Sequence, residues 1–317
     1  TQAVVAVLAG LDDESVGTEA AVDLIRTAVS ASTSSAGVAS SNVLTSKKSV
    51  MAVVDALAMH ATPKAQDHLA GLLTWLAEHS SESNNFDNHD LNPFTVGNSA
   101  ILTVGRIPWP LPKLVSAMEA VATTPSKLQN RAIAILGSVL RNLVEHSRGT
   151  LPEDDVQDME SWSLSPPEQV PSEVAALTSW LASELIHAVE NRNCSHPRGD
   201  GDGLPLGPML MAIHNTRNAL FAPILVGILS KEAQKKHAVT DEVRLLAVRA
   251  LGDLQRLTTS TDRNHNPSAV DRVLLSVLEN KAGDEPYFAQ VIALEGLGGR
   301  RTLDPEVLSR VAELALK

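Results

Sequence analysis

The residues best suited to chemistry lie on one predicted helix. Glu184 and His187 have the Glu-x-x-His spacing of carboxylate-bridged metal sites in helical bundles. Such a site needs a second copy of the motif and two further glutamates, and the sequence contains no second copy. We therefore interpret this pair as a surface turn near the end of a helix.

A second group of metal-binding residue types follows that helix. Cys194 and His196, together with His187, could recruit zinc, but they have no second pair at zinc-finger spacing. Asp200 and Asp202 resemble part of a calcium loop that lacks its third acidic ligand and its bidentate glutamate. A loop thiol beside histidines and a flexible turn are the favoured interpretations, so we predict no metal site.

Motifs for nucleophilic catalysis and for phosphate binding are absent from the sequence. There is no Gly-x-Ser-x-Gly elbow, no His-Glu-x-x-His and no Gly-rich loop after a strand, and the glycines of residues 296–299 suit the end of a helix. We predict no catalytic residues, no cofactor and no enzyme activity, with an enzyme that uses residues 184–196 as the remaining alternative. Asn193 begins a glycosylation sequon, which matters only if the chain is secreted.

The composition indicates helices as the elements that carry these residues. Aromatic residues make up only 3% of the 317 residues, and alanine and leucine, which favour helix, are abundant. The net charge of -11 argues against nucleic acid as a partner. The longest apolar stretch, residues 220–229, contains Pro223 and is about half as long as a membrane span needs. The single cysteine, Cys194, excludes an internal disulfide and leaves the compartment open.

Apolar residues recur at three-and-four spacing, which predicts a series of amphipathic helices. Start signals at Thr62-Pro63 and Asp304-Pro305 combine a capping side chain with a proline that suits a first turn. Because the connectors are short, neighbouring helices are expected to form hairpins. The predicted helices span residues 18–31, 49–60, 65–79, 111–123, 126–145, 173–189, 209–215, 220–230, 241–258, 269–279, 287–297 and 305–316.

Three of these helices share the pattern Ala-x-x-x-Leu-Gly, at residues 132–137, 247–252 and 293–298. A degenerate copy at residues 211–215 has His214 in place of the glycine. The copies at residues 211–215, 247–252 and 293–298 follow one another at intervals near the roughly 40 to 47 residues of a HEAT-like repeat. So short a pattern can also arise by chance. We predict an all-α fold, an α-α superhelix or HEAT-like solenoid of antiparallel helix pairs in two layers.

For the helix predicted at residues 241–258, the repeat pattern also predicts which side chains are buried and which are exposed. Alanine and glycine one turn apart on an inward stripe would let helices approach closely, with leucine supplying buried area. In residues 241–258 we accordingly expect Arg244 and Arg249 on an outer face and Leu246 and Leu251 in the core.

A single helical domain is expected over residues 1–317. Since the chain begins at Thr1 without methionine, we expect it to be excised from a longer protein. Ser-, Asn-, Asp-, Pro- and Gly-rich segments interrupt the helices and predict loop insertions near residues 30–46, 80–98, 148–172 and 191–208.

Three segments carry a resemblance to a known family: residues 50–57 (VMAVVDAL), residues 61–65 (ATPKA) and residues 130–140 (NRAIAILGSVL). The first two resemble a hairpin, and the third is similar to a helix, of the superhelical domain of the vitellogenin family of large lipid transfer proteins. Similar matches occur, in the same order, at residues 107–110, 210–229 and 243–251.

This resemblance implies a scaffold, the helical arch of a lipid-transport protein. Lipid would be held indirectly, by adjoining β-sheet domains of a larger secreted chain, while the arch offers contacts to protein partners. It would have no membrane span and would be extracellular or in the secretory pathway. The alternative is a free-standing, cytoplasmic HEAT-like adaptor that binds protein partners on its concave face.

Overall fold

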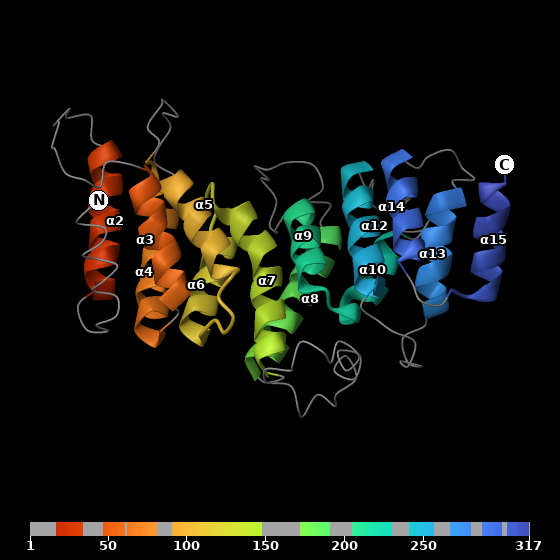
Figure 1. Ribbon diagram of the computed structural model, residues 1–317, viewed down its shortest axis with the longest axis horizontal. Coiled ribbons are helices and arrows are strands. Elements are labelled where there is room, and N and C mark those ends of the chain that lie inside the picture. Colours follow the sequence, from red (N-terminus) through yellow and green to blue (C-terminus); the bar gives the residue numbers. More distant parts are fainter. Residues whose placement is uncertain are drawn as a thin grey trace. The chain divides into compact units, whose positions relative to one another are not determined.

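Helices form all the regular structure in the described part of the computed structural model (Figure 1). The structure describes residues 17–33, 47–60, 62–80, 91–147, 172–190, 205–229, 241–256, 267–279, 287–299 and 303–316. Within these ranges there are thirteen α-helices, one 3-10 helix and no strand. The prediction of an all-α fold is confirmed.

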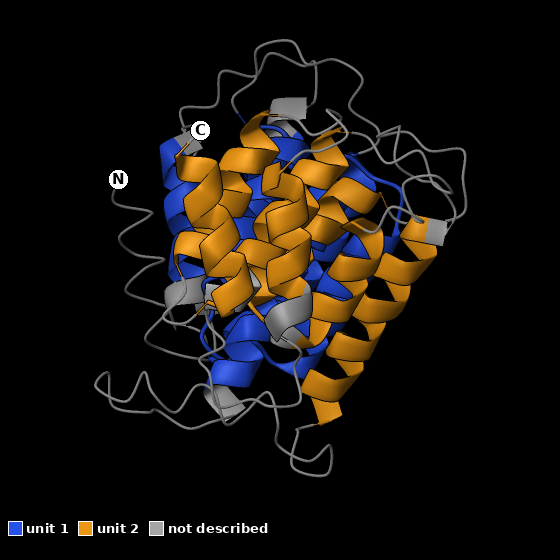
Figure 2. Cartoon of the chain, turned by 90° about the vertical axis from the view of Figure 1, so that its right-hand side faces the viewer, with its two compact units in different colours: residues 1–146 blue, residues 147–317 orange. Residues whose placement is uncertain are grey.

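The chain divides into two compact units, residues 1–146 and 147–317 (Figure 2). The single domain expected over residues 1–317 stays a prediction. The first unit contains α2 (Gly17–Thr33), α3 (Lys47–His60), α4 (Pro63–Ser80), α5 (Pro93–Val104), α6 (Pro112–Thr123) and α7 (Gln129–Ser147). The second contains α8 (Ser172–Glu190), α9 (Leu206–Thr216), η4 (Ala219–Phe221), α10 (Ala222–Leu229), α12 (Asp241–Arg256), α13 (Pro267–Glu279), α14 (Tyr287–Gly298) and α15 (Pro305–Ala315).

Helices of the first unit pack in two layers. Helix α4 packs against α2 and α6, whereas α3 packs against α5, so alternate helices lie side by side. Contacts between α2 and α3, α3 and α4, and α4 and α5 join the layers. This alternation is what short helix–helix connectors produce, because each helix folds back on the previous one.

The second unit repeats this arrangement. One layer runs through α8, α10, α13 and α15, and the other through α9, α12 and α14, with contacts between the layers from α8 to α9 and from α12 to α10 and α13. Helix α13 also packs against α14. Each unit therefore has the solenoid-like packing of sequential helix pairs that the sequence predicts.

Side-chain caps fix several helix starts. The Thr62 hydroxyl accepts from the Ala65 N–H at 3.2 Å, and the Asp304 carboxylate accepts from the Glu306 N–H at 2.9 Å. Both caps precede a proline, as the sequence predicted. Helix α7 begins at Gln129, three residues later than expected.

The predicted loops extend too far into the helices. Helix α5 lies partly inside the loop expected near residues 80–98, because Asn92 caps it by accepting from the Thr95 N–H at 2.7 Å and Pro93 occupies its first turn. Helix α2 continues to Thr33 and α9 begins at Leu206, within the expected loops near residues 30–46 and 191–208. Ser172 likewise begins α8, and residues 34–46, 81–90, 148–171 and 191–204 of the four predicted loops lie outside the described residues.

Glycine allows a close approach in the second unit, but only one of the two glycines involved was predicted. Gly252 is buried where α12 meets α14, and a Cβ on Gly296 would lie 3.0 Å from the Gly252 Cα. Gly298, the glycine of the sequence pattern, is exposed with nothing within 4 Å of an added Cβ. The contact is therefore made one half-turn earlier in α14 than the repeat implied.

The expected phase of α12 is wrong at Arg244. Arg249 is exposed and Leu251 is buried, as expected, but Arg244 is only 6% exposed and Leu246 is half-buried. Helix α12 packs against α9, α10, α13 and α14, so more than one of its faces is covered. A single inward stripe is too simple a description of such a central helix.

No helix in the described ranges combines the length and the apolar character that a membrane crossing requires.

Candidate functional site

The connector between α5 and α6, residues 105–111, follows a fixed path. It starts with two tight turns, in which the Arg106 N–H donates to the Thr103 carbonyl at 3.0 Å and the Ile107 N–H donates to the Val104 carbonyl at 3.1 Å. Pro108 and Pro110 then prevent helix from continuing, because proline has no N–H to donate. The backbone becomes extended before α6 begins.

Gln66 of α4 holds the second half of the connector. Its side-chain nitrogen donates to the Trp109 carbonyl at 3.1 Å, and its side-chain oxygen accepts from the Leu111 N–H at 2.7 Å. The Gln66 residue is only 1% exposed. A buried amide that pairs both its donor and its acceptor avoids the free-energy cost of an unsatisfied polar group.

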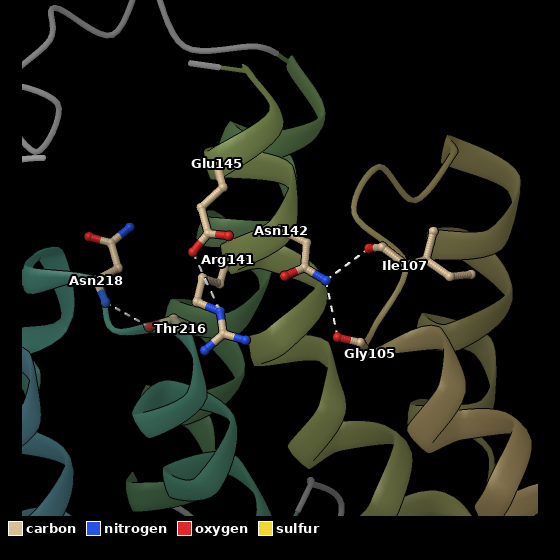
Figure 3. A network of polar contacts seen from close by, with 7 residues as sticks. All are labelled: Gly105, Ile107, Arg141, Asn142, Glu145, Thr216 and Asn218. Atoms are coloured by element: carbon tan, nitrogen blue, oxygen red, sulfur yellow. Dashed lines mark hydrogen bonds and ion pairs between the residues drawn. The ribbon is translucent and has the colours of Figure 1, made fainter. Parts of the chain in front are cut away.

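Asn142 of α7 holds the first half of the connector (Figure 3). Its side-chain nitrogen donates to the Gly105 carbonyl at 3.0 Å and to the Ile107 carbonyl at 2.8 Å. Asn142 is buried, and one turn later Glu145 forms an ion pair with Arg141 at 3.7 Å on the same helix. Two buried amides thus bind four backbone groups of one short connector.

The connector exposes side chains of the types that dominate protein interfaces. Trp109 is 46% exposed, and Arg106 and Pro108 are exposed. In the described part of the chain no carboxylate forms an ion pair with Arg106. Tryptophan and arginine are the side chains most often found at binding hot spots. Residues 105–111 are therefore the candidate interaction site of the first unit.

A charged cluster lies between α9 and α12 in the second unit. The Nδ1 atom of His214 is 3.2 Å from the Oδ2 atom of Asp253, and the two side chains are 21% and 32% exposed. The two atoms are within ion-pair range, but Nδ1 is buried and makes no hydrogen bond within the described structure. Burial lowers the pKa of His214; Asp253 acts in the opposite direction, and Arg249 and Arg217 lower the pKa further.

The metal-binding residue types picked from the sequence are not gathered into a site in the described structure. Glu184 is half-buried and His187 is exposed on α8. Among the described residues, no group of three or more His, Cys, Asp and Glu side chains is arranged to hold a metal ion. Asn193, Cys194, His196, Asp200 and Asp202 lie outside the described residues.

Sequence reasoning missed the two amides that hold the connector. Gln66 precedes Leu69 and Leu73 at helical spacing, and Asn142 follows Leu136 and Val139 in the same way, so each is a polar residue on a buried stripe. Such an interruption is the available signal, because a buried amide needs a partner on another element. The alternating prolines of residues 108–112 mark the segment that supplies that partner.

Comparison with models of protein families finds none that matches this chain, and comparison with curated proteins finds none either. The findings thus identify an all-helical protein with sequential helix packing and no family.

Proposed function

We propose that this chain is a helical scaffold that binds a protein partner, and that residues 105–111 form a contact surface for it. The observation that carries this proposal is the exposed Trp109 on a backbone that Gln66 and Asn142 hold from two different helices. A side chain presented on an ordered backbone loses little conformational entropy on binding, which favours affinity. In this proposal the chain has no catalytic residues of its own.

The exposed side chains of the connector indicate which chemical groups the partner's surface would carry. Trp109 offers a large apolar surface, so the partner would supply an apolar pocket. Arg106 offers a guanidinium three residues earlier, so the rim of that pocket would carry a carboxylate. The net charge of -11 disfavours nucleic acid and anionic lipid surfaces as alternatives.

Two variants distinguish a partner that binds at Trp109 from one that binds elsewhere on the chain. The tagged full chain would be purified from cells of its source as wild type, as Trp109→Ala and as Trp180→Ala, and the recovered proteins would be quantified. Trp180 is a half-buried tryptophan on α8, outside the connector, and is the matched control. We expect at least one protein that co-purifies with the wild-type chain to be absent from the Trp109→Ala preparation and present in the Trp180→Ala preparation. Equal recovery of every co-purifying protein with both variants would contradict the proposal.

A second candidate is the helical arch of a lipid-transport protein, which the resemblance to the vitellogenin family suggests. The observation that favours it is that two of the segments that carry the resemblance, residues 50–57 and 130–140, lie on α3 and α7. Residues 63–65 of the third segment begin α4, as the hairpin of the resemblance implies. Lipid would then be held by adjoining β-sheet domains, and the chain would be extracellular or in the secretory pathway.

Lipid analysis of the native protein tests this second candidate. The protein that contains this chain would be isolated from its source without detergent, and its lipids would be extracted and counted per chain. A lipid carrier would contain many lipid molecules per chain. A preparation free of lipid, from a product without β-rich sequence, would contradict the lipid-transport candidate and leave the adaptor.

A further inference from the structure

We propose that the second unit binds a second copy of this chain through the apolar surface of its last two helices, so that the protein forms a symmetric dimer. This surface, which we call the end face, consists of Tyr287, Val291 and Leu294 on α14 and of Leu308, Ala312 and Ala315 on α15. The proposal concerns the second unit only and is independent of the contact surface on residues 105–111.

Helix α14 has two apolar faces, of which only one is buried. The buried face packs against α12, where Gly296 meets Gly252. Tyr287, Val291 and Leu294 follow one another at spacings of four and three residues, which places them together on the side of α14 that points away from α12. Tyr287 is 74% exposed and Leu294 is 46% exposed. Since α14 is the last described helix of its layer, this second face points toward the end of the unit.

Helix α15 is the last described helix of the other layer (Figure 1). It packs against α13, and among the described residues of α15 only Val307 is buried. Leu308, Ala312 and Ala315 are exposed and follow one another at helical spacing, with Leu308 55% exposed. An apolar stripe on a helix is stabilising when another surface covers it, so α15 has a stripe that its own unit leaves open.

The end face has the composition of an interface. The terminal repeat of a solenoid is soluble when its outer face is polar, and none of the six side chains of the end face is charged. Phe288, beside Tyr287, is 70% exposed, and the two rings meet edge to face with their centroids 5.9 Å apart. Exposed aromatic side chains with few charges among them are typical of the centre of a protein interface.

The distribution of charge favours a second copy as the occupant. Residues 287–317 contain four acidic and four basic side chains, so their formal charge is zero, and residues 1–286 carry the whole net charge of -11. Two copies of so acidic a chain repel each other along most of their length, and this repulsion is weakest where the local charge is zero.

The arginines beside the end face are already paired within the chain. Arg272 of α13 lies 3.9 Å from Glu306, and Arg310 of α15 pairs with Glu279 and Glu313. A partner selected by opposite charge would therefore find no uncompensated charge on these two arginines. In a twofold interface the same patch of both copies meets, which suits an apolar patch whose surrounding charges are balanced.

Sedimentation equilibrium of the purified full chain tests the oligomeric state. We expect a mass twice the 33.7 kDa of one chain at high concentration. Leu294→Glu places a charge in the end face and should raise the dissociation constant of the dimer by about 100-fold. Leu220→Glu, at a leucine of η4 that is 48% exposed, is the matched control and should dimerise like wild type. Leu308→Glu tests the α15 side and serves if circular dichroism shows that Leu294→Glu does not fold.

A wild-type chain that stays monomeric at every concentration would overturn the proposal and show that something other than a second copy covers the end face. A dimer that the end-face variants do not weaken, or that Leu220→Glu weakens equally, would overturn it as well.

Hydroxyl-radical footprinting locates the contact. Tyr287 and Phe288 should react less in concentrated wild-type chain than in the same chain diluted to monomer, because the second copy covers their rings. Trp109 should react equally in both samples, since it lies on the other contact surface. Equal reactivity of Tyr287 and Phe288 in both samples would overturn the proposed end face.

Discussion

Gln66 of α4 and Trp109 of the α5–α6 connector are joined by a hydrogen bond of 3.1 Å from the glutamine side chain to the tryptophan carbonyl. This bond links a buried amide to the residue that exposes the largest side chain of the connector. Stability and recognition are thus connected at one residue, because the group that orders the backbone also determines where the indole is presented.

Replacing Gln66 with leucine removes that link at similar side-chain volume. The Trp109 carbonyl and the Leu111 N–H would lose their partner in a buried setting, so we expect unfolding free energy to fall by about 1–3 kcal/mol. Urea denaturation measures this change. Asp67→Asn breaks only an exposed ion pair with Lys113, which should contribute less than about 1 kcal/mol, and an equal loss in both variants would contradict the special role of Gln66.

Asn142→Ala should destabilise the first unit for the same physical reason. The carbonyls of Gly105 and Ile107 both accept from the Asn142 side chain, and we expect a loss of about 1–3 kcal/mol when they are left unpaired. Hydrogen exchange should be faster for the amides at the C-terminal end of α5 and for those of the connector, because both would open more often. Asn130→Ala, on the exposed surface of the same helix, should leave both measurements unchanged.

Gly296→Ala should destabilise the second unit, since its new Cβ would lie 3.0 Å from the Gly252 Cα. Backbone cannot move aside as a flexible side chain can, so overpacking of about 1–3 kcal/mol is expected in thermal or urea unfolding. Gly298→Ala in the same helix is the control, because nothing lies within 4 Å of its added Cβ. A stabilising effect of Gly296→Ala would contradict the close helix approach.

Burial of Glu119 on α6 makes the stability of the first unit depend on pH. Burial raises the pKa of Glu119 above 4.5, so the folded chain binds this proton more readily than the unfolded chain. Its effect on stability is most favourable below pH 4.5 and is lost as the pH rises through the raised pKa. Glu119→Gln should therefore be more stable than wild type at pH 7, with the difference smaller at pH 4.

The control for Glu119 is Glu78→Gln, which changes an exposed carboxylate on α4. Urea unfolding of the three proteins at both pH values measures the differences. An identical pH dependence of wild type and Glu119→Gln would show that burial of this carboxylate has no effect on stability.

Much of the fold could be predicted because it depends on local signals. Helix periodicity indicates the elements, and caps such as Thr62 and Asp304 indicate where they begin. Helix α5 was missed because residues 93–98 include proline, glycine and asparagine, which are typical of loops. The Asn92 cap and the buried side chains that follow it outweigh those propensities.

The candidate site could not be predicted because it depends on contacts between distant residues. As polar residues on buried stripes, Gln66 and Asn142 each indicate that a partner is needed, but the sequence does not indicate that both bind the same connector. Arg244 and Gly296 show the same limit, since which face of α12 or α14 is buried depends on how many neighbours each helix has. Periodicity predicts a buried stripe but does not predict a second one.

The most direct test of the proposed interaction is photocrosslinking from position 109 in living cells of the source. A photoreactive phenylalanine analogue would replace Trp109 in one version of the chain and Trp180 in another. The proposal predicts a discrete crosslinked protein from position 109 that wild-type chain competes away and that position 180 does not yield. No crosslink from position 109, or the same product from both positions, would contradict a protein partner at this connector.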